Sequence, residues 1–322
     1  MMTPEQLQAS HNELLAQEAF IRRAAAVGGP FMLKGSFVTR QYLPHPEQRI
    51  PQDLDWVCLT PAQSEEQMRA LLNAWATAVT EQPATDGFTF QSFRENTFWR
   101  MIEYAMSDDF PTVNTDVGVW LPGHSASTGT AMLSISVDVS FNLVVEPPPV
   151  PLTYRPLNGE PFSVPCTCPL ALQVAWKLHQ TLVRPRYKDL TDLIALMAVP
   201  AFDAATRAAA LQAFVDECHS DQVNPQKLSY YTTGEATADS RKFSYRESSW
   251  FQQLLNPSNE ASNPFKDIYL QYSHHLGADS KHYSSLPELL ADFQTALNRA
   301  GITKEMLAQL PATSIPNFPR TE

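Results

Sequence analysis

Two aspartates separated by a single residue stand at the start of an apolar segment. Asp53 and Asp55 flank Leu54, and the residues that follow, up to Leu59, have the composition of a β-strand. Because side chains alternate between the two faces of a strand, both carboxylates lie on one face. Carboxylate oxygens, water and substrate phosphates are the ligands that Mg²⁺ prefers. The pair therefore predicts a site for a divalent metal, Mg²⁺ or Mn²⁺, although such pairs also occur at solvated strand ends.

A glycine and a serine precede this pair at the junction of a strand and a helix. Gly35 and Ser36 follow the short apolar segment 31–34 and begin a helical pattern that runs to residue 42. Glycine lets a phosphate approach the backbone closely, and N–H groups at a helix start attract an anion. Ser36 adds a hydroxyl donor, but it would also serve as an ordinary helix N-cap. We predict that Gly35 and Ser36 bind the phosphates of a nucleotide.

A third carboxylate stands in a later segment of alternating polar and apolar residues. Asp138 lies in the middle of 136–140. If that strand neighbours the strand of Asp53 and Asp55, Asp138 completes a three-carboxylate site that could hold two metal ions and deprotonate an attacking hydroxyl. This chemistry is nucleotidyl transfer from an NTP. The alternative is that Asp138 only caps a solvent-facing strand.

Further charged residues are candidates for contacts with the NTP. Lys177 is an isolated cation in an apolar helical segment, so it either reaches across a cleft to the triphosphate or extends its charge to solvent. We predict a catalytic or orienting role for Asp189 and a nucleotide contact for Asp192, and the alternative for both is a surface position on a helix. Arg40 is predicted to neutralise phosphate charge, unless it is a surface or core-edge arginine.

The spacing of apolar residues predicts the elements that carry these side chains. Helical spacing covers 3–27, and a capping box of Ser64 and Gln67 begins a second long helix that ends near residue 79. Short apolar or alternating segments predict strands at 31–34, 53–59, 88–90, 99–106, 113–120 and 133–145. Together these strands would form a mixed sheet.

A proline-rich segment at 146–151 marks a change in composition. Consecutive prolines are stiff and cannot pair in a central strand, so we place a domain boundary there. The prediction is an α+β fold, with a nucleotidyltransferase domain at 1–150 and a mostly helical domain at 151–322. Helical spacing beyond the boundary covers 170–183, 190–197, 204–218, 264–276, 286–300 and 304–310, whereas 229–249 has the composition of an irregular loop or hairpin.

Composition limits the partners of the chain. Its 322 residues include 34 acidic and 23 basic side chains, which gives a formal net charge of −11. This balance argues against a broad positive surface for DNA. No apolar segment approaches the roughly 20 residues that span a bilayer, and the few cysteines do not suggest a disulfide framework. We therefore expect a cytoplasmic protein without a membrane partner.

Four short segments resemble a known family. They are Lys34-Gly35-Ser36 with Thr39-Arg40, Arg49 to Trp56, Ala175 to His179, and Arg186 to Leu193. In order and spacing this set resembles the AbiEii/AbiGii-type abortive-infection nucleotidyltransferase toxins, which belong to the polymerase-beta-like superfamily. The resemblance implies transfer of a nucleotide from an NTP, often to RNA such as the 3′ end of tRNA. It also implies a toxin–antitoxin or phage-defence role, a cognate antitoxin, and an NTP and metal bound between the two domains.

Two other functions remain open from the sequence. The same site could join NTPs to one another or modify a protein hydroxyl. Alternatively, the chain could be a non-catalytic interaction protein that keeps a degenerate nucleotidyltransferase fold. Binding of an NTP separates the enzymes from the interaction protein, and the labelled product separates the enzymes from one another.

Overall fold

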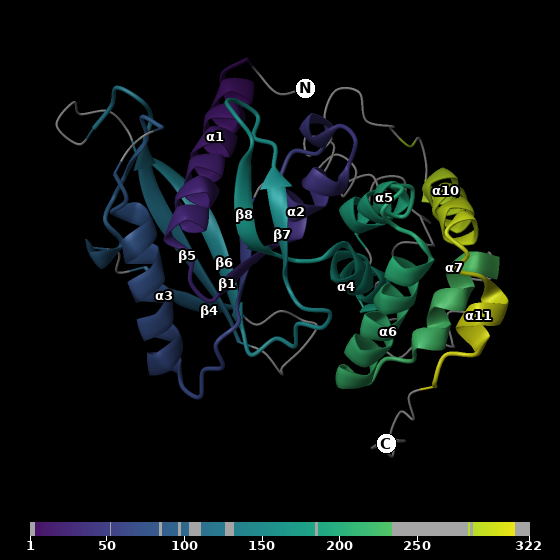
Figure 1. Cartoon of the computed structure of the whole chain (residues 1–322). Helices are drawn as coiled ribbons and strands as arrows, with labels where there is room; N and C mark the ends of the chain where they lie inside the picture. The colour runs from purple at the N-terminus through teal and green to yellow at the C-terminus, as the bar shows by residue number, and fades with distance from the viewer. Residues whose placement is uncertain are drawn as a thin grey trace, which may run out of the picture. The chain divides into compact units, whose positions relative to one another are not determined.

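The computed structural model describes residues 4–51, 53–83, 86–95, 98–102, 111–125, 132–183, 186–233, 283 and 286–312 (Figure 1). Contacts within the chain divide it into two compact units. The first, called the sheet unit below, comprises Met1–Gln41 and His45–Cys168. The second, called the helical unit, comprises Tyr42–Pro44 and Pro169–Glu322.

In the residues that the structure describes, the sheet unit contains a mixed sheet and three α-helices. Its helices are α1 (Pro4–Val27), α2 (Gly35–Tyr42) and α3 (Glu65–Thr80). Its strands are β1 (Phe31–Lys34), β2 (Leu54–Cys58), β3 (Thr89–Phe90), β4 (Arg100–Ile102), β5 (Thr112–Trp120), β6 (Leu133–Phe141), β7 (Val150–Tyr154) and β8 (Phe162–Thr167). The strand order is β3-β5-β6-β2-β1-β8-β7, and β4 pairs with β5. The pairs β2–β6 and β1–β8 are parallel, whereas the other pairs are antiparallel.

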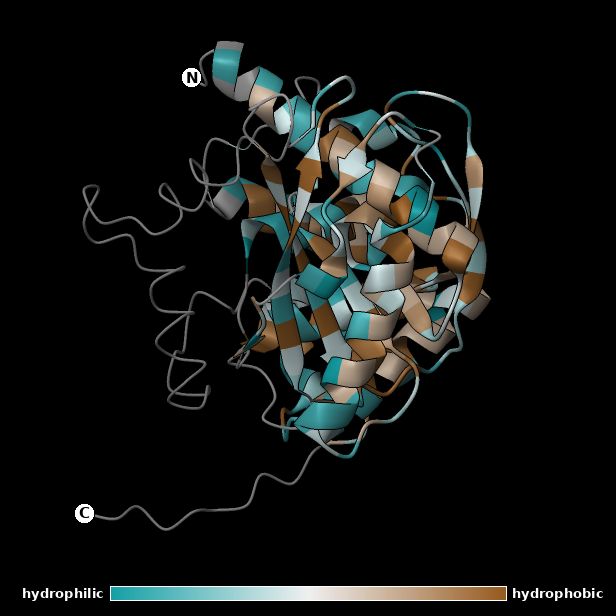
Figure 2. Ribbon diagram, turned by 90° about the vertical axis from the view of Figure 1, so that its left-hand side faces the viewer, coloured by the Kyte–Doolittle hydropathy of each residue, from teal (hydrophilic) through white to brown (hydrophobic). Residues whose placement is uncertain are grey.

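An aromatic cluster fixes one face of this sheet. Trp75 of α3 stacks on Phe31 at 4.3 Å between ring centroids and meets Trp56 of β2 at 5.0 Å. Phe20 of α1 packs edge-on against Trp75 at 5.8 Å. Apolar residues at 133, 135, 137 and 139 alternate with polar residues in β6, and Figure 2 shows both kinds of residue along the strands. Because Trp56 points to the helices, Asp55 beside it in the sequence points to the opposite face.

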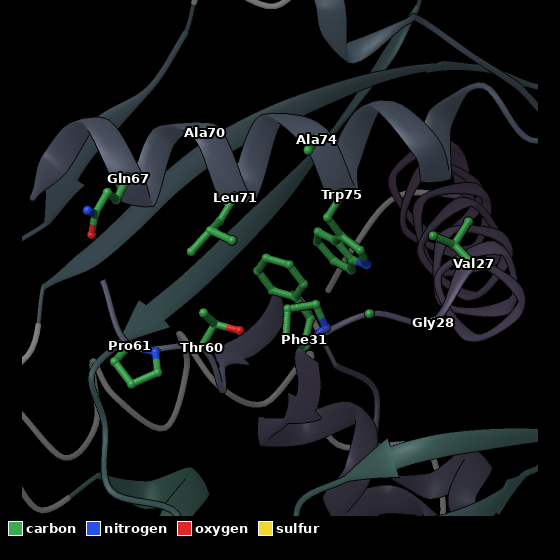
Figure 3. Close-up of a pocket in the computed structure, with 12 residues that line it drawn as sticks. Val27, Gly28, Phe31, Thr60, Pro61, Gln67, Ala70, Leu71, Ala74 and Trp75 are labelled. Carbon is green, nitrogen blue, oxygen red and sulfur yellow. The ribbon is translucent and has the colours of Figure 1, made fainter. Parts of the chain in front are cut away.

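An apolar pocket of about 600 Å³ opens on the helix-covered face of the sheet, between α3 and the segment that leads into β1 (Figure 3). Leu71 and Trp75 line one side of it, and Phe31 and Pro61 line another. Its lining residues include no charged side chain. The pocket is therefore not a candidate phosphate site.

The predicted α+β fold is confirmed, and most predicted elements of the sheet unit are present. Ser64 caps α3 as predicted, because its hydroxyl accepts a hydrogen bond from the Gln67 backbone N–H at 3.3 Å, while the Gln67 side chain accepts one from the backbone N–H of Gln63 at 2.7 Å. The predicted strand at 99–106 is β4, and its residues beyond 102 lie outside the described ranges.

The sheet continues past the proline-rich segment, which the sequence analysis did not anticipate. β7 and β8 pair with each other, and β8 pairs with β1. Pro151 lies in β7 at an irregularity between Val150 and Leu152, and β7 is at the edge of the sheet. A proline there removes no hydrogen bond from a central ladder. The compact units divide at 168/169, and the division into functional domains at 1–150 and 151–322 stays a prediction.

The helical unit consists of packed helices in the part of the chain that is described. They are α4 (Leu170–Val183), α5 (Tyr187–Leu196), α6 (Ala204–Ser220), α7 (Ser229–Thr233), α10 (Leu286–Arg299) and α11 (Lys304–Ala308), with a 3₁₀ turn at Pro225–Leu228. The prediction of an irregular segment at 229–249 is wrong for residues 229–233, which form α7. Residues 234–249 and the predicted helix 264–276 lie outside the described residues. None of the described helices combines the length and apolar character that a membrane span requires.

Candidate active site

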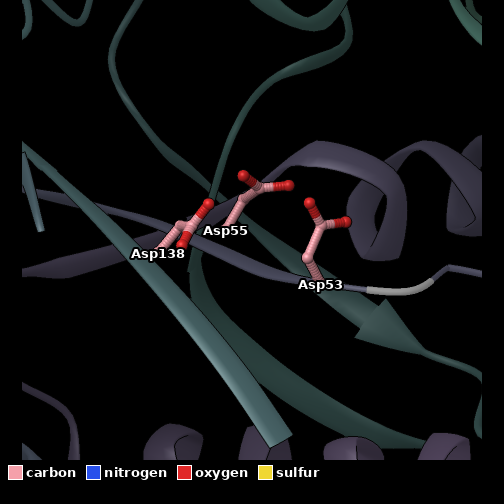
Figure 4. A group of neighbouring side chains, drawn as sticks. All are labelled: Asp53, Asp55 and Asp138. Carbon is pink, nitrogen blue, oxygen red and sulfur yellow. The ribbon is translucent and has the colours of Figure 1, made fainter. Parts of the chain in front are cut away.

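The three predicted carboxylates lie together in the sheet unit. β2 and β6 are parallel neighbours, and their register places Asp55 directly beside Asp138. Asp53 immediately precedes β2. One ligand oxygen from each of the three lies within 4.8 Å of the others. Figure 4 shows the three side chains on the same side of the strands. The structure thus brings Asp138 to an acidic pair that lies at least 83 residues earlier in the chain, counted from 55 to 138.

Hydrophobic burial fixes the register that brings these carboxylates together. Leu54 and Trp56 flank Asp55 and are 0% and 2% exposed, and Val137 and Val139 flank Asp138 and are equally buried. A slip of one residue would turn these apolar side chains away from the core and the aspartates into it. The apolar residues of β2 and β6 therefore determine where the carboxylates point.

The start of α2 adjoins the carboxylates. Gly35, its first residue, has a φ of +69°, which side chains other than glycine rarely tolerate. A Cβ atom at this position would overlap the carboxylate of Asp55. Beside it, the Ser36 hydroxyl is buried, and among the described residues it has no hydrogen-bond partner. A close approach of backbone to carboxylate and a buried free hydroxyl are features of a site built for a further ligand.

The donor set fits a hard divalent cation. Three carboxylates converge. The ammonium of Lys34, in the neighbouring strand β1, lies 3.5 Å from Oδ1 of Asp55. Asp138 is 7% exposed, so it is held largely out of solvent. Oxygen ligands of this kind, with positions left for substrate and water, suit Mg²⁺ or Mn²⁺. Asp53, Asp55 and Asp138 are thus the residues that could bind the metal.

A model of a protein family, described as "Nucleotidyl transferase AbiEii toxin, Type IV TA system", matches residues 20–312. The chain belongs to this family. It is therefore a nucleotidyltransferase and a toxin of a type IV toxin–antitoxin system, which confirms the resemblance found in the sequence.

Two solved structures are similar to the toxin. A protein from H. pylori described as a nucleotidyltransferase is 12% identical, with a TM-score of 0.40, and the match covers 96% of this chain and 99% of that one. The nucleotidyltransferase toxin MenT4 from Mycobacterium tuberculosis H37Rv is 13% identical, with a TM-score of 0.45 and coverage of 94% of each chain. No curated protein matches the toxin.

Replacing Gly35 with alanine is expected to damage both the fold and the metal site of the toxin. The added methyl group must adopt a left-handed backbone conformation, which costs roughly 1–2 kcal/mol, and it must also displace the Asp55 carboxylate. Thermal melting and Mn²⁺ titration would measure the two effects. Gly159→Ala is the matched control, because Gly159 also has a positive φ, of 89°, but nothing lies within 4 Å of its added Cβ. Equal metal affinity in both variants would contradict the expectation.

A second charged cluster lies inside the helical unit. Lys177 of α4 places Nζ 2.8 Å from Oδ2 of Asp192 and 3.2 Å from Oδ1 of Asp189, both on α5. Arg186 donates to the other oxygen of Asp189 at 2.5 Å. Asp189 and Asp192 are 1% and 2% exposed. These residues thus form a buried ion-pair network between α4 and α5.

The network shows where Lys177, Asp189 and Asp192 lie, and so bears on the solvent-exposed alternatives for these residues. Lys177 is buried and does not extend its ammonium to solvent, and neither aspartate lies on a helix surface. Burial raises the pKa of the Asp189 carboxyl, but the charges of Arg186 and Lys177 lower it more, so the pKa lies well below its usual range. Asp189 is therefore ionised at neutral pH. Its catalytic role and the contact of Lys177 and Asp192 with the nucleotide stay predictions.

Arg40 does not join the carboxylates in this structure. It is 1% exposed, and its guanidinium donates to Oε1 of Glu18 at 3.0 Å and to the carbonyl of Pro46 at 3.0 Å. Glu18 also accepts hydrogen bonds from the Tyr154 hydroxyl and the backbone N–H of Leu157. Arg40 therefore ties α1 and α2 together, and the structure favours this role over the predicted nucleotide contact.

Sequence reasoning missed the residues that surround Asp138. Asn114 of β5 donates a hydrogen bond to Oδ1 of Asp138 at 2.6 Å. The available signal was an amide inside a predicted strand, because the segment 113–120 already included Asn114. Its partner could not be read from the sequence, since the pairing of β5 with β6 is a tertiary feature.

Proposed function

We propose that the toxin transfers a nucleotide from an NTP to an RNA acceptor, such as the 3′ end of tRNA, with Mg²⁺ or Mn²⁺ bound by Asp53, Asp55 and Asp138. The observation that carries this proposal is the register of β2 and β6, which sets Asp55 beside Asp138 with all three ligand oxygens within 4.8 Å. A free 3′ hydroxyl of RNA is a nucleophile of the kind that such chemistry needs.

The residues of the site have distinct proposed roles. Gly35 and Ser36 at the start of α2 bind the β- and γ-phosphates through the backbone N–H groups and the buried hydroxyl. Asp53 and Asp55 hold the metal, and Asp138 either completes its ligands or accepts the proton of the attacking hydroxyl. When bound, the metal neutralises charge on the phosphates and favours departure of pyrophosphate.

The network in the helical unit has a supporting place in this proposal. Lys177 supplies a positive charge whose position is fixed by Asp189 and Asp192. A fixed ammonium loses little freedom when it contacts a triphosphate. We retain Lys177 as a proposed phosphate contact, and Asp189 and Asp192 as the residues that orient it.

The proposed partners follow from the same chemistry. The toxin family implies a cognate antitoxin, and the reaction needs an NTP and a hydroxyl acceptor. NTPs and RNA are both abundant in the cytoplasm, which is where we place the reaction.

The test is transfer of label from an NTP. The purified toxin would be incubated with each α-³²P-labelled NTP in turn, Mg²⁺ and total RNA. We expect label in RNA with at least one NTP, and none after chelation of the metal. Label on protein, or in short oligonucleotides formed without RNA, would replace the proposed acceptor. No labelled product with any NTP would overturn the proposal.

A further inference from the structure

A row of polar residues crosses the sheet at the level of the carboxylates. Residues directly opposite one another on successive strands are Lys34 of β1, Asp55 of β2, Asp138 of β6, Asn114 of β5 and Arg100 of β4. The two acidic residues in the middle of the row belong to the metal site described above. Asn114 and Arg100 have no role in the reaction as proposed so far.

Asn114 is bonded on both sides. Its amide nitrogen donates to Oδ1 of Asp138 at 2.6 Å and to the Ser136 hydroxyl at 2.9 Å. Its amide oxygen accepts from Nε of Arg100 at 2.8 Å. Asn114 itself is 4% exposed, whereas Arg100 lies at the surface. A buried amide with all of these bonds made has a single orientation that satisfies them.

Arg100 determines which end of the amide faces Asp138. The guanidinium has only donors, so the oxygen of Asn114 must face Arg100 and the nitrogen must face the carboxylate. With the amide reversed, its oxygen would face the oxygen of the Asp138 side chain and two donors would face each other. The pair therefore presents a fixed donor to Oδ1 of Asp138. The donor is neutral and adds no positive charge that would compete with a cation.

We propose that Asn114 is a positioning residue for Asp138, and that Arg100 acts through Asn114 by holding its amide in the required orientation. This inference rests on the proposed function, because it assigns Asp138 to the metal site. The hydrogen bond restricts rotation of the Asp138 carboxylate, which is one of the three carboxylates that could hold the metal. Partners behind a metal ligand commonly affect metal affinity in this way.

The competing explanation is that Asn114 only joins β5 to β6. A matched control separates the two explanations. Thr112 and Ser140 are also opposite each other on β5 and β6, and their hydroxyls are 3.2 Å apart. Thr112→Val removes this contact between the same two strands without touching Asp138. If Asn114 has only a structural role, Asn114→Ala and Thr112→Val should behave alike.

The experiment is titration of the metal-free toxin with Mn²⁺ alone, followed by the electron paramagnetic resonance signal of the free ion. We expect Asn114→Ala to bind Mn²⁺ about 10- to 100-fold more weakly than the unmodified toxin, and Thr112→Val to bind it as the unmodified toxin does. Arg100→Ala should weaken binding less, and should add no further loss in the Asn114→Ala background. Because Arg100 is exposed, this variant tests the proposal even if Asn114→Ala folds poorly.

Three results would decide the matter. Unchanged Mn²⁺ affinity in Asn114→Ala and Arg100→Ala overturns the positioning role and leaves the proposed function standing. Additive losses in the double variant overturn the role of Arg100 through Asn114. Absence of Mn²⁺ binding by the unmodified toxin overturns the metal site, and the positioning role with it. With NTP, excess Mn²⁺ should restore kcat of Asn114→Ala, which a general loss of folding would not allow.

Discussion

Replacing Asp55 with asparagine is expected to reduce nucleotide transfer by on the order of 100-fold or more while leaving the fold intact. The magnitude is comparable with removal of a preorganised group that stabilises the transition state. An amide is a poor substitute for a carboxylate on a hard cation. The change should be measured as kcat/KM for the NTP, together with thermal melting curves.

The melting curves make this prediction specific to a metal site. Asp55 lies beside Asp138, so loss of one negative charge should leave the metal-free variant at least as stable as the unmodified toxin. Only the unmodified toxin should gain stability from Mg²⁺ plus NTP. Asp216→Asn makes the same chemical change at an exposed position of α6 and should transfer normally. Undiminished turnover of Asp55→Asn would remove the carboxylates from the mechanism.

Replacing Lys177 with alanine is expected to lower the free energy of unfolding by roughly 3–5 kcal/mol, the usual cost of removing one partner from a buried ion pair. Asp192 loses the ammonium at 2.8 Å and Asp189 loses it at 3.2 Å, while both stay buried. Urea unfolding at neutral pH would measure the change. Adding Asp192→Asn to Lys177→Ala should recover part of the loss, because it removes a buried charge. A loss below about 1 kcal/mol would contradict the buried network.

The same variant tests the proposed phosphate contact. If Lys177 contacts the triphosphate, kcat/KM at a temperature where the variant is folded should fall by the equivalent of about 2–4 kcal/mol. Leu182→Ala is the matched control, because it empties a buried position of the same helix and should cost a similar 2–5 kcal/mol of stability. A loss of less than about threefold relative to that control, under ~0.7 kcal/mol, would show that Lys177 serves the fold alone.

Local features of the chain determined much of the sheet unit. Alternation along β2 placed Asp53 and Asp55 on one face, and the apolar periods of α1 and α3 and the capping box at Ser64 predicted helices that the structure contains. Such signals extend over a few residues, because strand alternation and helical spacing repeat every two to four positions. The sequence by itself was therefore sufficient to predict the α+β class, the acidic pair and the junction at Gly35.

Tertiary structure alone decided which of these parts meet. Asp138 joins the pair because β6 lies parallel to β2 in one register, and Asn114 reaches Asp138 because β5 lies on the other side of β6. Lys177 is buried against α5, and Arg40 against Glu18, because distant segments supply their counter-charges. Strand pairing and ion pairing between remote segments depend on burial of a shared core, which no short window of sequence contains.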